Sequence, residues 1–351
     1  MQINGIQFLR FVAVLLVVGS HVVLEIWRRM GDHGDFHYLH VAGGHGVDIF
    51  FVISGFVITI STLKMVGNGG AAAAWLFCKR RLIRIVPMYW LYTGLKAVLV
   101  IAVGSKAFSA GLAPGYLVSS LLFWPTTNPN GNHLPLLESG WTLSYEMLFY
   151  ASFAVAIWRN WAPLRFSLLA LGIVFLLGQI DDMPLALSFF GRTLLFEFLL
   201  GGMIARLWVR QVPVHQAVAP LLLLAASLLL FVFPMQHVDR LIGEGLPAAM
   251  LVASAVWLDR YAGVRRFAGY FKLLGDASYS IYLSHGLLVP VLVIVAQKVG
   301  IHNRVAVFLV GVAGALALGC VLYLCLEKPV TDWLNRRYTA RKPVTVRATP
   351  A

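Results

Sequence analysis

The stretch INGIQFLRFVAVLLVVGSHVVLEI, residues 3–26, is long and apolar enough to cross a bilayer as one helix. Arg10 and His21 lie inside it. On a helix, the eleven-residue step between them is a rotation of about 1100°, roughly 20° from complete turns, with a rise of about 16 Å. The two side chains therefore share one face at two depths. Because ionisable groups inside membrane helices usually face the bundle interior or a water-filled path, the pair predicts a functional site.

The composition is that of a membrane protein. Of 351 residues, 59% are hydrophobic and 12% are charged, which is too apolar for a single water-soluble core. We therefore predict an all-α, polytopic integral membrane protein. Apolar stretches near twenty residues with few charges predict about ten transmembrane helices. Their approximate bounds are 5–25, 45–63, 82–103, 139–158, 166–180, 187–206, 217–235, 244–258, 277–297 and 305–325.

The positions of Lys and Arg set the expected orientation, since cytoplasmic loops retain these residues. With the N-terminus inside, 19 of the 28 fall in cytoplasmic segments, and both termini are predicted to be cytoplasmic. The formal charge of +13 is then mostly a topology signal. Because no basic domain stands apart, we expect no nucleic-acid partner.

We divide the chain into a transmembrane domain, residues 1–335, and a basic tail, residues 336–351, which we expect to be disordered at the cytoplasmic membrane surface. Longer external segments are expected at about residues 27–44 and 104–138. The first of these segments has four histidines in or beside it: His33, His37, His40 and His45. We expect them to be solvated rather than to bind a metal. The chain has only three cysteines, and their spacing is not that of a disulfide framework or a metal site. We therefore expect neither.

Ionisable residues inside or beside the predicted spans fall into two groups by depth. The outer half holds His21, Asp48 and Glu146, and the inner half holds Arg10, Arg81 and Arg84. Guanidinium groups can hold a phosphate-bearing cytosolic donor, while an imidazole and carboxylates can activate a hydroxyl nearer the outside. A carboxylate from Asp48 or Glu146 on the second ring nitrogen would orient His21. This division suits an enzyme with two substrates.

Each of these residues also has a structural interpretation. Arg81 and Arg84, with Lys79 and Arg80, could be only a positive-inside anchor, and Asp48 could cap its helix. Arg10 could pair with His21 structurally, and Glu146 could be a buried hydrogen-bonding group. His285 suits helix packing and pocket lining equally. Two further residues, Arg192 and Glu197, could simply pair.

Six fragments, in order along nearly the whole chain, resemble the acyltransferase family 3 membrane O-acyltransferases, and in particular the branch that acetylates bacterial exopolysaccharides. The first is Phe8-Leu9-Arg10-Phe11 with His21, which look like the family's Arg and His. The others are residues 46–56 (GVDIFFVISGF), 80–89 (RRLIRIVPMY), 141–150 (WTLSYEMLFY), 279–285 (YSIYLSH) and 327–329 (EKP). Many members carry two adjacent Glu in the fourth fragment, whereas this chain has Met147 in the second place.

The resemblance implies an O-acetyltransferase of the bacterial cytoplasmic (inner) membrane that uses acetyl-CoA as donor substrate and has no permanently bound cofactor. It implies His21 as catalytic base and Arg81 and Arg84 as donor-binding residues. We assign Arg10 to donor positioning or oxyanion stabilisation. Glu146 is then the single acidic candidate of its fragment, and Asp48 is kept as a catalytic candidate. The remaining substrate-binding candidates are Trp141, Tyr145 and His285.

The expected acceptor is a sugar hydroxyl of a cell-surface polysaccharide or of its lipid-linked oligosaccharide precursor. Membrane lipid and polysaccharide assembly proteins are the further expected partners. The alternative from another class is a secondary transporter or flippase of polysaccharide precursors, because intramembrane Arg, His and Glu also mark transport paths. Transporters often show paired halves with broken helices, and no such duplication is visible here. A scaffold protein would need no buried ionisable residues.

Overall fold

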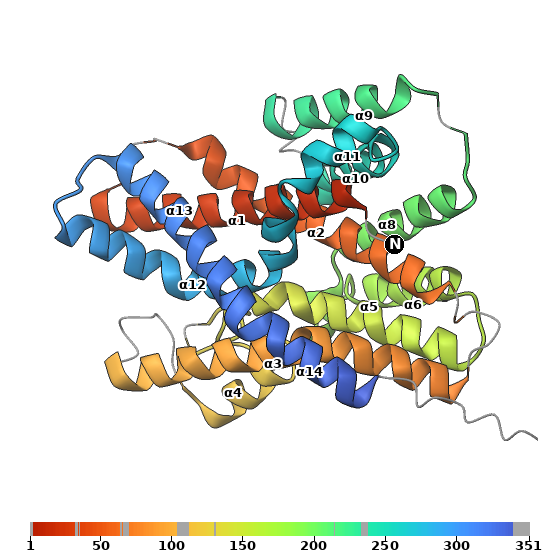
Figure 1. The fold of residues 1–351 in the computed structure, drawn as a ribbon. Coiled ribbons are helices and arrows are strands. Elements are labelled where there is room, and N and C mark those ends of the chain that lie inside the picture. The colour runs from red at the N-terminus through yellow and green to blue at the C-terminus, as the bar shows by residue number, and fades with distance from the viewer. Residues whose placement is uncertain are drawn as a thin grey trace, which may run out of the picture.

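The computed structural model describes residues 3–31, 34, 36–63, 65, 70–103, 112–129, 131–213, 215–232 and 238–339, and within these ranges it contains helices and no strand (Figure 1). The α-helices are α1 (Asn4–Met30), α2 (His37–Thr62), α3 (Ala71–Val103), α4 (Pro114–Leu121), α5 (Gly140–Trp158), α6 (Pro163–Leu177), α7 (Leu185–Phe190), α8 (Leu195–Val209), α9 (Val218–Ser227), α10 (Leu246–Leu258), α11 (Ala262–Gly269), α12 (Lys272–Lys298), α13 (Arg304–Leu322) and α14 (Lys328–Tyr338). Three π-helical segments extend them: η2 (Leu228–Val232), η3 (Leu241–Gly245) and η4 (Tyr323–Glu327).

Within these described ranges, six helical stretches are long and apolar enough to cross a membrane: Asn4–Met30, His37–Thr62, Ala71–Ala102, Leu241–Leu258, Lys272–Lys298 and Arg304–Tyr338. Helices also occupy the other predicted spans, but some are short. The fifteen residues of α6 and of α8 rise only about 22 Å, against a hydrocarbon core of about 30 Å. The all-α, multi-pass membrane class is therefore supported, while the count of ten is not confirmed and the orientation of the termini stays a prediction.

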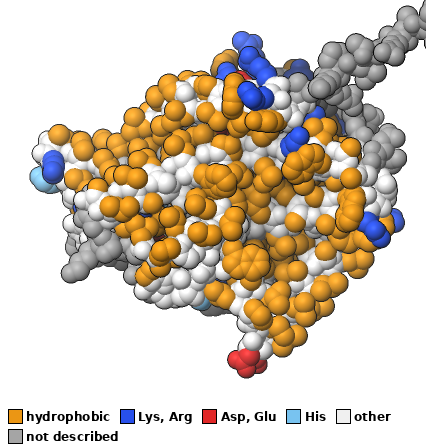
Figure 2. All heavy atoms as spheres, turned by 90° about the horizontal axis from the view of Figure 1, so that it is seen from below, with side chains coloured by type: hydrophobic (Ala, Val, Ile, Leu, Met, Phe, Trp, Pro, Cys, Tyr) orange, Lys and Arg blue, Asp and Glu red, His pale blue; other side chains and the backbone are white. Residues whose placement is uncertain are grey.

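The outer surface agrees with a membrane environment. Seen from below, the face in Figure 2 is mostly hydrophobic, with Lys and Arg confined to its margins. Large apolar side chains are exposed along α3 and include Leu82, Trp90, Leu91, Leu95 and Val98. In a soluble protein such a continuous apolar surface would promote association, whereas in a bilayer it contacts lipid.

Two segments differ from the sequence prediction. The predicted external segment 27–44 is largely helical, because α1 continues to Met30 and α2 begins at His37. His45 is therefore a buried helical residue and is not solvated, whereas His33 lies outside the described residues. At the other end, α14 continues to Tyr338 and includes Arg336 and Arg337, while residues 340–351 lie outside the described residues. The division into domain and tail stays a prediction.

The helix α2 is the element that connects the two polar regions described below. It packs along α1 on one side and crosses α8 on another. Glycines allow this crossing: a Cβ on Gly55 would lie 1.9 Å from the Phe198 carbonyl oxygen, and a Cβ on Gly201 would lie 1.9 Å from the Val52 carbonyl oxygen. The two backbones touch directly, so the position of α2 is fixed by small residues at both sides of the contact.

The long helix α3 forms a second layer with α5, and α14 lies against α3 (Figure 1). The first layer consists of α1, α2 and α12. Hydrogen bonds join the two layers. The Tyr279 hydroxyl on α12 donates to the Ile85 carbonyl of α3 at 2.7 Å. The Tyr282 hydroxyl pairs with Thr142 of α5 at 2.9 Å. The cavity considered next lies between these layers.

Candidate active site

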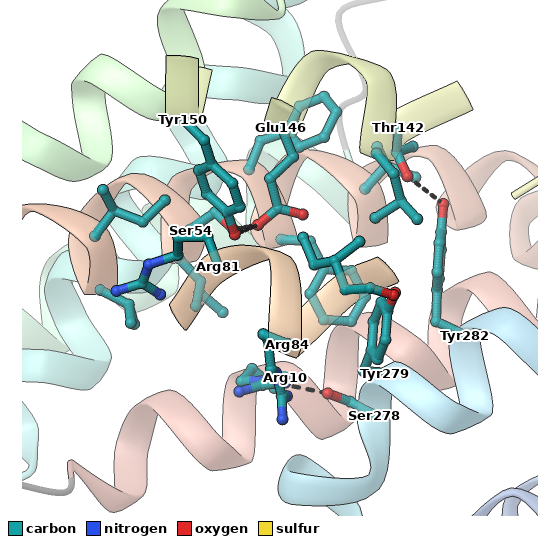
Figure 3. A pocket seen from close by; sticks show the side chains of 18 residues that line it. Arg10, Ser54, Arg81, Arg84, Thr142, Glu146, Tyr150, Ser278, Tyr279 and Tyr282 are labelled. Carbon is teal, nitrogen blue, oxygen red and sulfur yellow. Dashed lines mark hydrogen bonds between the residues drawn. The ribbon is translucent and has the colours of Figure 1, made fainter. Parts of the chain in front are cut away.

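A cavity of about 140 Å³ lies between α1, α2, α3, α5 and α12 (Figure 3). Its wall combines charged and hydroxyl-bearing side chains with apolar ones. The polar members are Arg10, Ser54, Arg81, Arg84, Thr142, Glu146, Tyr150, Ser278, Tyr279 and Tyr282. The structure thus brings together four of the predicted site residues, Arg10, Arg81, Arg84 and Glu146, from three different helices.

Glu146 is held in the cavity by two hydroxyl groups. The Ser54 hydroxyl donates to its Oε1 at 2.7 Å, and the Tyr150 hydroxyl donates to the same oxygen. Ser54 comes from α2, whereas Tyr150 lies one turn further along α5. Two hydroxyl donors to one carboxylate oxygen fix the direction of the Glu146 side chain in the cavity.

The three arginines of the cavity differ in their partners. Arg84 Nη1 forms an ion pair with Glu327 at 3.0 Å, and its guanidinium lies 5.6 Å from the Tyr279 ring centroid. Glu327 is fully buried and also accepts the Ser280 hydroxyl at 2.6 Å. The charge of Arg84 is therefore largely compensated from within the protein.

Arg10 and Arg81 contact neutral groups instead. Arg10 Nε donates to the Ser278 hydroxyl at 3.1 Å. Arg81 Nη2 donates to the Ser61 hydroxyl, and the Arg81 guanidinium lies over the rings of Phe77 and Tyr150. The Nε of Arg81 is buried and has no hydrogen-bond partner among the described residues. Among the cavity arginines, Arg81 thus has the clearest unused donor.

His21 lies against His285, with ring centroids 4.5 Å apart in an edge-to-face arrangement. His21 Nδ1 contacts the Val17 carbonyl oxygen at 2.9 Å, and His285 Nδ1 contacts the Tyr282 carbonyl oxygen. Because a carbonyl oxygen can only accept, each Nδ1 carries the hydrogen, and each neutral ring has its lone pair on Nε2. His285 is also 5.6 Å from the ring of Tyr282, which lines the cavity.

The predicted common face of Arg10 and His21 is confirmed. Both side chains contact α12, where Arg10 reaches Ser278 and His21 packs on His285. The seven-residue step from Ser278 to His285 corresponds to a rise of about 10 Å along α12. Arg10 and His21 therefore lie at two levels of one helix interface, with Arg10 in the cavity wall and His21 outside the set of residues that line the cavity.

The orientation expected for His21 is different in the structure. The Val17 backbone carbonyl, rather than a carboxylate of Asp48 or Glu146, accepts the hydrogen bond from the Nδ1 of His21. Asp48 is instead bonded to Arg240, with Nε and Nη2 at 2.9 and 3.1 Å from its two oxygens. Asp48 lies outside the set of residues that line the cavity, and its predicted catalytic role has no contact here that supports it.

The other predicted residues pack beside the cavity. Trp141 packs edge-on against Phe51 and Tyr145, and the fully buried Tyr145 donates its hydroxyl to the Phe189 carbonyl. The proposed pair of Arg192 with Glu197 is wrong. Arg192 is exposed, whereas Glu197 is fully buried and neither of its oxygens has a hydrogen-bond partner in the described structure.

Several residues in the cavity or paired with it were not predicted as site residues. Glu327 could have been found, since a carboxylate directly after the last apolar run, near Arg-rich segments, needs a partner. Ser54, Ser278 and Tyr150 carry no comparable signal. Hydroxyl-bearing residues are common on helix surfaces within membranes, and only the packing of α2, α5 and α12 directs these three into the cavity.

The chain matches the family described as acyltransferase domain over residues 3–324. It belongs to this acyltransferase family, and the protein is an acyltransferase enzyme. It is 33% identical over 315 residues to exopolysaccharide production protein ExoZ of Rhizobium meliloti (strain 1021), covering 86% of this chain and 92% of that protein. It is 29% identical over 175 residues to nodulation protein 10 of Rhizobium leguminosarum bv. viciae, covering 45% and 46%. No solved structure matches this chain.

Proposed function

We propose that the protein transfers an acetyl group from cytosolic acetyl-CoA to a sugar hydroxyl of a cell-surface polysaccharide or its lipid-linked precursor. The observation that carries this proposal is the cavity in which Arg10, Arg81 and Arg84 face Glu146, next to the pair of His21 and His285. The name of the relative from Rhizobium meliloti, an exopolysaccharide production protein, supports the class of acceptor. We place the enzyme in the inner membrane of a bacterium.

Donor binding is assigned to the arginines. Arg81 has a buried Nε–H without a hydrogen-bond partner among the described residues, and its planar guanidinium can hold a phosphate by two parallel hydrogen bonds. Arg10 has only the neutral Ser278 as hydrogen-bond partner among the described contacts and is assigned to the thioester end of the donor. There its charge would stabilise the oxyanion that forms when the thioester carbonyl is attacked.

His21 is assigned as the base. With its Nδ1–H bonded to the Val17 carbonyl, Nε2 has the lone pair that can take the proton of the sugar hydroxyl. The hydroxyl oxygen then attacks the thioester carbonyl, the carbon–sulfur bond breaks, and the proton is passed to the leaving thiolate. The products are the acetyl ester and free CoA. Glu146, held by Ser54 and Tyr150, would orient acceptor hydroxyls in the cavity.

The test uses the full-length protein in native membranes or nanodiscs, with acetyl-CoA labelled in the acetyl group and the lipid-linked oligosaccharides or exopolysaccharide of the host as acceptors. We expect label in the carbohydrate fraction, ester resonances by NMR, and release of free CoA. A secondary transporter or flippase would leave the thioester intact, so acceptor-dependent loss of label from acetyl-CoA separates the two. Intact acetyl-CoA with every acceptor would overturn the proposal.

A further inference from the structure

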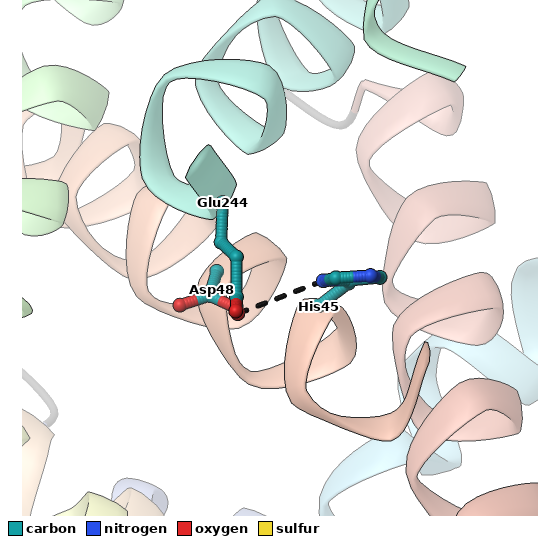
Figure 4. A group of neighbouring side chains, drawn as sticks. All are labelled: His45, Asp48 and Glu244. Carbon is teal, nitrogen blue, oxygen red and sulfur yellow. Dashed lines mark ion pairs between the residues drawn. The ribbon is translucent and has the colours of Figure 1, made fainter. Parts of the chain in front are cut away.

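Outside the cavity, a second group of ionisable side chains gathers at the junction of α2, η3 and α8 (Figure 4). His45 and Asp48 come from α2, and Glu244 comes from η3. His45 is 4% exposed and Asp48 is fully buried. One donor atom from each of the three residues lies within 4.8 Å of the other two.

This group has a surplus of negative charge. Arg240 bonds Asp48 through two nitrogens and lies 3.4 Å from Glu244. Glu197 of α8 is fully buried, and Asp48, Arg240 and Glu244 lie within electrostatic reach of it. Three carboxylates against one guanidinium leave a formal charge of −2 when all are ionised. Burial in a low-dielectric surrounding makes that surplus costly unless a cation or protons compensate it.

Three of these groups have unused ligand atoms. The Nδ1 of His45, the Oε2 of Glu244 and both oxygens of Glu197 are buried without a hydrogen-bond partner among the described residues. Figure 4 shows the His45 ring directed toward Glu244, and its Nδ1 lies 3.6 Å from the Glu244 Oε2. That separation is too long for a hydrogen bond, but two ligand atoms about 2.1 Å from a tetrahedral zinc ion lie about 3.4 Å apart.

The group is distinct from the cavity. Asp48 and the cavity residue Ser54 are six residues apart on α2, so their side chains point about 120° apart around the helix axis. The exposed fractions of the Arg240 and Glu244 side chains are 33% and 31%, so the group reaches the surface of the molecule through these two side chains. An ion here would connect α2 to η3 beside α8 without entering the acyl-transfer cavity.

We propose that His45, Asp48 and Glu244 bind one divalent metal ion of the zinc type, with Glu197 as a neighbouring carboxylate that completes the charge balance. The mixed nitrogen and carboxylate donor set suits Zn²⁺, and a charge of +2 matches the surplus of the group. The ion is structural, since it holds the crossing of α2 with η3. The competing arrangement is a proton shared between Glu197 and Asp48 in place of the ion.

The decisive measurement is metal content. Full-length protein in detergent, with any affinity tag removed, is stripped with a chelator, incubated with Zn²⁺, desalted and analysed by plasma mass spectrometry. We expect about one equivalent of zinc and a higher temperature of unfolding than in the stripped protein. Co²⁺ in place of Zn²⁺ should give visible absorption bands from nitrogen and oxygen ligands.

The variants His45→Gln and Glu244→Gln should each weaken zinc binding at least tenfold. The matched control is Glu138→Gln, because Glu138 is exposed and pairs with Lys96 elsewhere. A stripped wild-type protein that retains no zinc and shows no thermal shift would overturn the proposal and favour the shared proton. Equal zinc retention in wild type, both variants and the control would show adventitious binding and would overturn it as well. The measurement needs no acyl transfer, so it is independent of the proposed function.

Discussion

The two polar groups inside this protein are built from similar residue types, but their charges are balanced in opposite ways. In the cavity, three arginines face Glu146, and Glu327 pairs with Arg84 from outside the cavity lining; each of these carboxylates accepts at least one hydrogen bond. At the junction of α2, η3 and α8, a single guanidinium faces three carboxylates, and Glu197 has no hydrogen-bond partner within the described structure. The cavity therefore suits an anionic ligand, whereas the junction suits a cation.

The largest expected effect is the loss of acyl-transfer rate when His21, beside the cavity, is replaced. The His21→Ala variant should lower the rate of acyl transfer about a hundred- to ten-thousand-fold, because it removes the proposed general base. Initial rates with labelled acetyl-CoA in membranes measure this effect, with protein amount normalised. His133→Ala is the control, since His133 lies in an exposed segment and should keep wild-type rates. Near-normal transfer in His21→Ala would remove His21 from the mechanism.

Both regions should fail together when the crossing of α2 and α8 is disturbed. Gly201→Ala places a methyl group against the Val52 carbonyl, which is backbone and cannot move aside alone. We expect a loss of about 3 kcal/mol in stability, the upper part of the range for overpacking, together with loss of activity. The control is Gly94→Ala, where the added Cβ meets nothing within 4 Å. Thermal unfolding in detergent measures the stability of Gly201→Ala and of Gly94→Ala. Equal stability of the two variants would contradict the tight crossing of α2 and α8.

These two regions also show what the sequence could predict. The long apolar stretches and the charges within them were sufficient for the all-α membrane class and for the common face of Arg10 and His21. The family was indicated separately, by the six sequence fragments. Asp48 was predicted as an ionisable catalytic candidate at the start of its span; it is fully buried, and its catalytic role stays a prediction. Its partner could not be predicted, because Arg240 is 192 residues away and only the crossing of the helices brings it near.

The errors have similar physical causes. His45 was expected in a solvated segment because glycines and polar residues precede it, yet packing against neighbouring helices allows α2 to begin at His37. Sequence spacing alone placed Glu197 beside Arg192, and the structure separates them because Glu197 faces α2 and η3. Local sequence thus predicts which residues are costly to bury, whereas tertiary packing decides which partner compensates each one.

A smaller effect should distinguish the cavity arginines from one another. Arg81→Ala should raise KM for acetyl-CoA about tenfold, the effect of losing one charge-assisted contact, with a smaller change in kcat. Arg81→Lys keeps the charge but loses the planar fork and should lie between wild type and Arg81→Ala. Saturation curves with purified protein measure the split between KM and kcat. Identical donor KM in wild type and both variants would dismiss Arg81 from donor binding, while zinc content at the junction should not change in any of them.

The smallest effect is expected when Glu146, the cavity carboxylate, loses one hydrogen-bond donor and so becomes more like Glu197, which has none among the described residues. Tyr150→Phe removes one of the two hydroxyl donors to Glu146 and leaves the Ser54 hydroxyl in place. Since a typical hydrogen bond contributes about 1 kcal/mol, we expect roughly a fivefold loss in kcat/KM if Glu146 orients the acceptor, with little change in donor KM. Ser54→Ala should act in the same direction, because it removes the other donor to the same oxygen. Wild-type acceptor kinetics in both variants would mean that Glu146 needs no orienting donors. The difference between Glu146, which accepts two hydrogen bonds, and Glu197, which accepts none among the described residues, would then have no functional meaning.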